Sequence, residues 1–168
     1  MKPDGGRIAA VILDDAQYDI WILEIARDML TRLTFDDATN YGPVWSADGE
    51  WIYFTSERKG EDGNLFRKRS DGTGETQRLT QSELDQRFWS ASPDGKWLVF
   101  EERSAERGTD IMLLSLDGEE LETRAFLSRS FVDMMPAISP DGKWLTYVSD
   151  ESGEFEAYVQ PFPQGGHG

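Results

Sequence analysis

The sequence predicts an all-β fold made of propeller-type blades, each a sheet of four antiparallel strands. The hexapeptide S-P-D-G-K-W occurs at 92–97 and again at 139–144, and a degenerate copy, S-A-D-G-E-W, occupies 46–51. The first serines of these copies lie 46 and then 47 residues apart. Two further markers keep the same phase: D-I-W-like triplets beginning at Asp19, Asn64, Asp110 and Glu156, and R-L-T triplets beginning at Arg32 and Arg78. A period of this length is typical of radially repeated β-sheets.

Each repeat contains four short strand patterns, as the second unit illustrates. Residues 51–55 are an almost continuous apolar run, which is typical of a strand covered on both faces. Residues 76–80 are more polar, as suits an outer edge strand. We expect the strands of this unit, from innermost to outermost, at 43–46, 51–55, 65–69 and 76–80.

The whole chain, residues 1–168, is expected to be one propeller domain of about four blades. The repeat units are 7–34, 43–80, 89–126 and 136–163. The first unit lacks its innermost strand and the last stops after its third strand, so two blades are complete and two are partial. Residues 19–34 have a helix-forming composition, but the repeat phase favours strands. A β-sandwich would show alternation with one polar face, which this pattern lacks.

The repeated hexapeptide has the composition of a tight hairpin turn. Proline presets the backbone at the first central position, and glycine supplies the positive φ that closes a turn with a bulge. The leading serine can hydrogen-bond the turn backbone. We therefore interpret Asp48, Asp94 and Asp141 as turn residues rather than ligand-binding residues.

The S-P-D-G-K-W hairpins, D-I-W or D-I-M strands and R-L-T edges resemble the repeats of TolB-type β-propellers. Similar repeats occur in the propellers of prolyl-oligopeptidase-family peptidases and in domains linked to bacterial serine/threonine kinases, to which the tail 158–166 is most similar. The resemblance covers residues 7 to 163. It implies the propeller fold but no particular activity, because many activities share this repeat. Closed propellers of this type usually have six or more blades, so this chain is short for the family.

Composition narrows the range of partners. The 168 residues hold 17 Lys and Arg against 32 Asp and Glu, a formal charge of −15. Nucleic acid and anionic membranes are therefore poor partners, and no apolar run is long enough for membrane insertion. With no Cys and only His167, a histidine- or thiolate-ligated metal site is not expected, and neither is any cofactor. No signal peptide is apparent, which predicts a cytoplasmic chain as written, or a periplasmic one if a leader has been removed.

Catalytic signatures are missing from the sequence. There is no G-x-S-x-G nucleophile elbow, no G-x-G-x-x-G loop and no H-R-D motif. Acidic pairs such as Asp36-Asp37 are too common to be informative. We therefore predict a non-enzymatic module that binds a protein or peptide through its loops. The alternatives are a carbohydrate- or peptide-processing enzyme, or the propeller part of one, using the central funnel, and a structural remnant with no ligand.

If a ligand binds, propeller geometry places it at the loops that join an outermost strand to the next innermost strand. These loops are 36–41, 81–87 and 128–133. Either they line a funnel for a peptide or sugar, or they are solvated and cap the innermost strands. The candidate ligand-binding residues are Asp37, Asn40, Tyr41, Asp85, Gln86, Arg87, Arg129 and Asp133.

The end blades would each leave an apolar face uncovered, and repeat arrays need a cap or a neighbour there. Three arrangements would supply one: closure as a small four-bladed ring, completion of a larger ring by a second chain, or membership of a longer protein. We favour a homodimer that completes a larger propeller.

Overall fold

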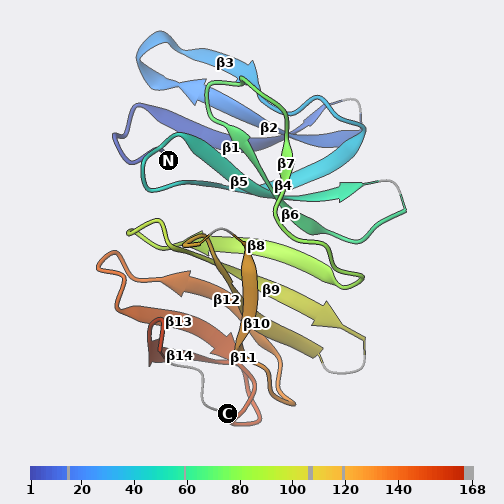
Figure 1. Cartoon of the computed structure of the whole chain (residues 1–168), viewed down its shortest axis with the longest axis vertical. Helices are drawn as coiled ribbons and strands as arrows, with labels where there is room; N and C mark the ends of the chain where they lie inside the picture. Colours follow the sequence, from blue (N-terminus) through green and yellow to red (C-terminus); the bar gives the residue numbers. More distant parts are fainter. Residues whose placement is uncertain (15, 59, 106–107, 119, 165–168) are drawn as a thin grey trace. The chain divides into compact units, whose positions relative to one another are not determined.

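The computed structural model describes residues 1–14, 16–58, 60–105, 108–118 and 120–164. His167 and two residues of the tail motif, Gly165 and Gly166, lie outside this part. The chain divides into two compact units, Met1–Glu83 and Leu84–Gly168. Each unit holds two antiparallel sheets (Figure 1). The all-β prediction is confirmed.

The first unit begins with a three-stranded sheet in the order β1-β2-β3 and continues with a four-stranded sheet in the order β4-β5-β6-β7. Among the described residues the first sheet has three strands and lacks an innermost strand, as predicted. Ile25, which we expected in a strand, lies instead in a short 3-10 turn, η1 (Ile25–Arg27), between the second and third strands. The strands are β1 (Arg7–Asp14), β2 (Gln17–Glu24), β3 (Met29–Arg32), β4 (Ala38–Trp45), β5 (Trp51–Arg58), β6 (Asn64–Arg69) and β7 (Gln77–Arg78).

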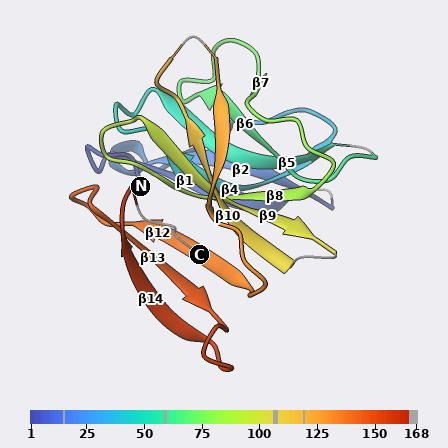
Figure 2. The ribbon, with the colours of Figure 1, turned by 60° about the horizontal axis from the view of Figure 1, so that its bottom comes forward.

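The second unit holds a four-stranded sheet, β8 to β11 in sequence order across the sheet, and a three-stranded sheet in the order β12-β13-β14. Figure 2 shows the strands of this last sheet side by side. Among the described residues the last sheet has three strands and no fourth, as predicted. The strands are β8 (Asp85–Ala91), β9 (Trp97–Ser104), β10 (Gly108–Ser115), β11 (Glu122–Leu127), β12 (Asp133–Ile138), β13 (Trp144–Ser149) and β14 (Glu156–Pro161).

The repeated hexapeptide forms the hairpin turn that its composition predicts. In the second copy, the Gly95 N–H donates to the Ser92 carbonyl at 3.0 Å, and Gly95 has φ 72°. The Ser92 hydroxyl donates to Asp94 at 2.5 Å and accepts the Trp97 N–H at 2.9 Å. Asp94 in turn accepts the Lys96 N–H. The same four contacts recur in the other two copies, so serine and aspartate are both consumed by the turn.

The R-L-T marker has a structural role at the outer edge of both sheets of the first unit. Thr34 Oγ1 accepts the Ile20 N–H and donates to the fully buried carboxylate of Asp19 at 2.6 Å. Arg32 donates to the same carboxylate at 2.6 Å. Thr80 likewise accepts the Leu65 N–H, at 3.0 Å. The threonine therefore continues the ladder where the outermost strand ends.

Each unit has its own hydrophobic core between its two sheets. In the first unit the core residues are Ile20, Ile22, Leu33, Trp45, Ile52, Phe54 and Phe66. In the second they are Val99, Ile111, Leu113, Phe126, Leu127, Leu145, Tyr147 and Phe162. Burying one such large side chain contributes about 1.5–3 kcal/mol, so this packing, rather than any one hairpin, holds neighbouring sheets together.

Candidate functional site

The meander of each sheet separates two kinds of strand end. The S-P-D-G turns lie at one end, and the connections between sheets lie at the opposite end, which we call the connection end. Because β5 and β6 are antiparallel neighbours, residues 60–63 between them return to the connection end, where they lie near residues 81–83. All eight predicted site residues come from the connection ends of the two units.

The connections are shorter than the sequence suggested. Strand β4 starts at Ala38, β8 at Asp85 and β12 at Asp133, so six of the eight candidate residues lie in strands. The reason is register: polar residues pair directly with the far ends of the second strands. These strand residues include Asn40, Tyr41, Gln86 and Arg87, together with Asp85 at the strand start.

Asn40 is fully buried, and its hydrogen bonds hold the segment that leads into β4 of the first unit. Its amide donates to Asp36 and to the Ala38 carbonyl, both at 3.1 Å. Arg58, at the end of β5, donates to the other carboxylate oxygen of Asp36 at 2.9 Å. Its neighbour Tyr41 donates to Glu57 at 2.7 Å. These contacts tie the chain entering β4 to the end of β5.

In the second unit an arginine holds the segment that leads into β12. Asp133 is fully buried and accepts hydrogen bonds from Arg129 on both carboxylate oxygens, at 2.8 and 3.2 Å. Arg129 also donates to Glu151, beyond the end of β13. The hydrogen bond to Asp133, with Glu151 adding to it, raises the pKa of Arg129 above its usual value. Arg129 is therefore permanently charged and held in place.

The two ion pairs, Asp36–Arg58 and Arg129–Glu151, occupy the same repeat positions, but the acidic and basic residues are exchanged. Asp36 and Arg129 each lie ten residues before the turn serine of their blade, and Arg58 and Glu151 each lie twelve residues after it. Before β4 the acidic residue comes first in the chain and its basic partner follows at the end of β5, whereas before β12 the basic residue comes first and its acidic partner follows after β13. The repeat thus determines the two positions at which an ion pair forms, but the sign of the charge at each position differs between blades.

The remaining predicted residues are less enclosed. Gln86 is buried and donates to Glu102, its cross-strand partner, at 2.6 Å. Arg87 and Asp85 are partly exposed and lie 3.2 Å apart in an ion pair. Asp37 is exposed and lines a hollow of about 470 Å³ with Gln17, Glu57, Arg58 and others. The structure therefore brings Asp37 together with Glu57 and Glu61, and uses Asn40, Gln86 and Asp133 inside the fold.

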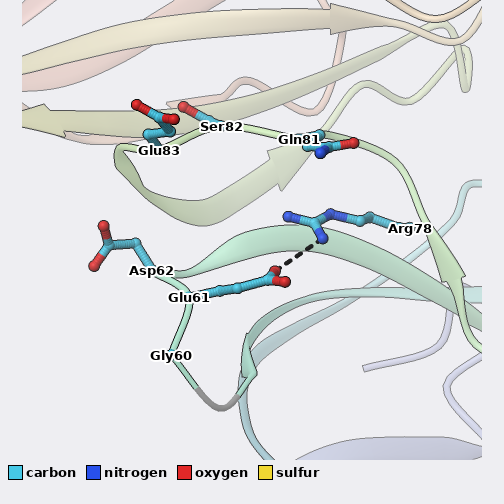
Figure 3. Close-up of a pocket in the computed structure, with 7 residues that line it drawn as sticks. All are labelled: Gly60, Glu61, Asp62, Arg78, Gln81, Ser82 and Glu83. Atoms are coloured by element: carbon cyan, nitrogen blue, oxygen red, sulfur yellow. Dashed lines mark hydrogen bonds and ion pairs between the residues drawn. The ribbon is translucent and has the colours of Figure 1, made fainter.

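A larger hollow of about 660 Å³ lies at the connection end of the first unit (Figure 3). It opens between two loops that run from β5 to β6 and from β7 to β8. Arg78 reaches across and donates to Glu61 at 2.8 Å, and it also donates to the Thr80 carbonyl. No described residue forms an ion pair with Asp62 or Glu83. The lining residues are Gly60, Glu61, Asp62, Arg78, Gln81, Ser82 and Glu83.

Sequence reasoning included Gln81 in a candidate loop but missed the opposite wall, Glu61 and Asp62. The signal was available: a hairpin loop after the second strand must return to the connection end. Asn64 fixes the distance between the walls, because its side chain accepts the Ser82 N–H at 2.8 Å and donates to the Ser82 carbonyl at 3.2 Å. The two walls of this mainly acidic recess are therefore tied together at Asn64.

Within the described residues, no three or more His, Cys, Asp and Glu side chains come together in a group that could hold a metal ion. The same part of the chain contains no helix of the length and apolar character required to cross a bilayer.

Four-stranded antiparallel sheets that repeat along the chain and pack in pairs through apolar faces are the blades of a β-propeller. The chain belongs to the TolB β-propeller domain family, whose model matches residues 1–161.

Individual relatives agree with this assignment. An uncharacterized protein of Agrobacterium fabrum is 35% identical over 155 residues, which is 88% of this chain and 52% of that protein. An uncharacterized peptidase of Bacillus subtilis, YuxL, is 26% identical over 94% of this chain and 31% of that protein. The crystal structure of TolB from Acinetobacter baumannii superposes with a TM-score of 0.79 at 21% identity, covering 97% of this chain and 40% of TolB. The chain thus spans from about a third to half of the proteins it matches.

Proposed function

We propose that this TolB-like propeller module is non-enzymatic and binds a protein or peptide through its connection ends. The observation that carries the proposal is the pair of hollows in the first unit, of about 660 and 470 Å³, which share Glu61 in their linings. Most of the side chains that line them are charged or polar, and the smaller hollow also includes Ala16 and Ala38. Such walls suit an extended segment that brings its own hydrogen-bonding groups and charges.

The charge of these walls favours a basic segment. Glu57, Glu61, Asp62 and Glu83 face only Arg58 and Arg78 among the lining residues of the two hollows, and both arginines are already ion-paired. A Lys or Arg side chain entering beside Asp62 and Glu83 would meet carboxylates that no described residue neutralises. An acidic segment would be repelled.

Fluorescence anisotropy with labelled peptides of matched length tests this proposal. We expect a lysine- and arginine-containing peptide to bind, and its affinity to fall as salt rises. Replacing Asp62→Asn or Glu83→Gln should weaken binding about 2- to 5-fold each, the range for exposed charge pairs. Glu75→Gln, an exposed glutamate at the opposite strand ends, is the matched control and should change nothing. Equal binding of an acidic peptide would contradict the proposal.

A second candidate is the propeller part of a longer peptidase. The similarity to the Bacillus peptidase, which covers 94% of this chain and 31% of that protein, favours it. These 168 residues contain no nucleophile elbow, so any hydrolysis would belong to another part of such a protein. Assay of the isolated chain against peptide and oligosaccharide substrates distinguishes the two: we expect no turnover by this chain.

We also propose that a second copy of this chain completes a larger ring, because each blade of a repeat array packs on a neighbour. A ring would bring the connection ends of several blades around one funnel.

A further inference from the structure

A further, more degenerate copy of the repeated hexapeptide, K-P-D-G-G-R, occupies residues 2–7. It forms the same turn, because the Gly5 N–H donates to the Lys2 carbonyl at 2.8 Å and the Lys2 N–H donates to the Arg7 carbonyl at 2.8 Å. In the other three copies a tryptophan stands at the last position. Arg7 therefore replaces a tryptophan of the repeat.

A second aromatic position of the repeat is also polar in the first unit. Ser70 and Phe162 are equivalent, because the N–H of each donates, at 2.8 Å, to the carbonyl of the residue that precedes its own blade's tryptophan. In the second unit Phe162 belongs to the core, and Trp97 packs against that core. The first unit has Arg7 and Ser70 in place of this aromatic pair.

A hollow of about 260 Å³ lies beside these two polar residues, and Arg7 and Ser70 both line it. All of its lining residues belong to the first unit. It lies at the strand ends that carry the S-P-D-G turns, so we call it the turn-end hollow. Its apolar wall includes Ile22 and Leu33, which are 7% and 3% exposed. Replacement of two aromatic side chains by an arginine and a serine accounts for this space.

Arg7 is held in the turn-end hollow without a carboxylate partner. Its guanidinium lies 5.3 Å from the centre of the Trp45 ring, and it donates one N–H to the Ser70 carbonyl at 3.3 Å. Glu24, opposite Arg7 in the ladder, is paired with Arg27 instead. Among the described residues Arg7 has no ion pair. A guanidinium has five N–H donors, so most of those on Arg7 are available to a ligand.

The other charged residues that line the turn-end hollow are already bound. Arg32 donates to the buried Asp19 carboxylate at 2.6 Å. Asp71 accepts the Thr73 N–H at 2.9 Å and the Thr73 hydroxyl at 2.7 Å, so its carboxylate closes a turn. The hollow thus offers one uncommitted positive charge beside an apolar wall.

From this arrangement we infer that the turn-end hollow binds a small carboxylic acid with an apolar body. The planar fork of a guanidinium matches a carboxylate and can bind both of its oxygens. The wall at Ile22 and Leu33 suits an aliphatic group of a few carbons. A doubly charged phosphate is disfavoured, because Glu24 and Asp71 also line the hollow. A free acid and the C-terminal residue of a peptide present the same chemistry.

Titration of the full chain with N-acetyl-leucine, followed by its backbone amide signals and the indole N–H signal of Trp45, tests the inference. We expect saturable shifts at Arg7, Thr31 and Gly72. The dissociation constant should be about 1 mM, as is typical of a ligand with about a dozen non-hydrogen atoms. N-acetyl-leucinamide keeps the apolar body but lacks the charge, so it should bind about 10-fold more weakly or worse.

Three variants test the role of the arginine. Arg7→Met removes the charge from a long side chain and should weaken binding about 10-fold or more. Arg7→Trp restores the tryptophan of the repeat, so it should abolish binding without lowering stability in urea. Lys143→Met removes an exposed positive charge from the corresponding turn of the second unit, and this matched control should bind like the parent. The comparison of acid with amide on the parent chain stands even where a variant is unstable.

Isocaproate distinguishes the two sources of the acid. Binding as tight as that of N-acetyl-leucine would indicate a free acid, and weaker binding would indicate a peptide end; both results uphold the inference. Equal binding of acid and amide, unchanged binding by Arg7→Met or Arg7→Trp, or tighter binding of inorganic phosphate would overturn it. Asp62→Asn should leave this binding unchanged, so the turn-end hollow and the proposed peptide site at the connection end are tested separately.

Discussion

Removing the buried turn serine of the second hairpin, by Ser92→Ala, should destabilise the chain by about 2.5–3 kcal/mol. Ser92 is 2% exposed. Its hydroxyl donates to the Asp94 carboxylate at 2.5 Å and accepts the Trp97 N–H at 2.9 Å. A hydrogen bond to a charged group contributes about 1.5–3 kcal/mol, and leaving a partner without one costs about 1–3 kcal/mol. Because Asp94 is exposed and recovers water, the lower part of the summed range applies.

Ser139→Ala is the matched control within the same chain. It removes the same two bonds, at 2.6 and 3.0 Å, but both are exposed, so water replaces them. We expect a loss of less than about 1 kcal/mol there. Urea unfolding followed by tryptophan fluorescence measures both. If Ser92→Ala cost no more than Ser139→Ala, or if it reduced peptide binding while leaving stability unchanged, the interpretation of the hexapeptide as a turn element would be wrong.

Three further perturbations test the same account. The hydroxyl of Ser92 lowers the pKa of Asp94 below its usual value near 3.8, and the Lys96 N–H adds to this effect. The free energy of folding that Asp94 contributes is therefore fully present above pH 3.8 and is lost as the pH falls through the lower pKa of the folded state. In urea unfolding between about pH 6 and 2.5, Asp94→Asn should lose stability less steeply with acid than the parent chain does. Asp19→Ala should cost about 3 kcal/mol in urea unfolding, the low end for breaking a buried ion pair, because Arg32 retains some access to water; a cost below 1 kcal/mol would contradict this. A double-mutant cycle of Arg129→Met and Asp133→Leu should give a coupling energy above about 1.5 kcal/mol, whereas additive effects would show that the connection is not fastened by this pair.

The hairpins were predictable because their chemistry is local. Proline, aspartate and glycine fix the turn within four residues, and Gly95 adopts the positive φ that the sequence implied. The phase of the repeats then located the strands, although the three innermost strands begin three to five residues earlier than expected. Ile25 departed from this pattern because the link between β2 and β3 ends in Asp28, which takes a left-handed conformation after a 3-10 turn.

The candidate site was only partly predictable, because burial depends on contacts across strands. Asn40, Gln86 and Asp133 were recognisable as a recurring polar position, but residue types alone do not show which neighbour each one binds. Their partners are Asp36 and Arg129, each four residues earlier in the chain, and Glu102 on the adjacent strand. The reversed ion pairs at Asp36–Arg58 and Arg129–Glu151 depend on register that residue types alone do not reveal. Sequence showed that these positions are polar, and the structure shows that they hold the fold together.

The exposed residues of the connection ends remain as the proposed binding surface, and Asp37, Asp62 and Glu83 are exposed carboxylates within it. Because Asn40, Gln86 and Asp133 are buried, the proposed binding surface lies on the loops beside the strand ends rather than on the strand ends themselves. The recess near Arg78 is held open by Asn64, which links β6 to the chain leading into β8. A fixed recess loses less conformational freedom on binding than a flexible loop would.

An amide chemical-shift map of the chain, titrated with a basic peptide, tests the binding proposal most directly. We predict shifts that saturate at Glu61, Asp62, Gln81 and Glu83, while the turn residues Asp48, Asp94 and Asp141 at the opposite strand ends stay unchanged. Shifts confined to the S-P-D-G turns, or no saturable shift at the connection ends, would contradict the proposal that this module binds its partner there.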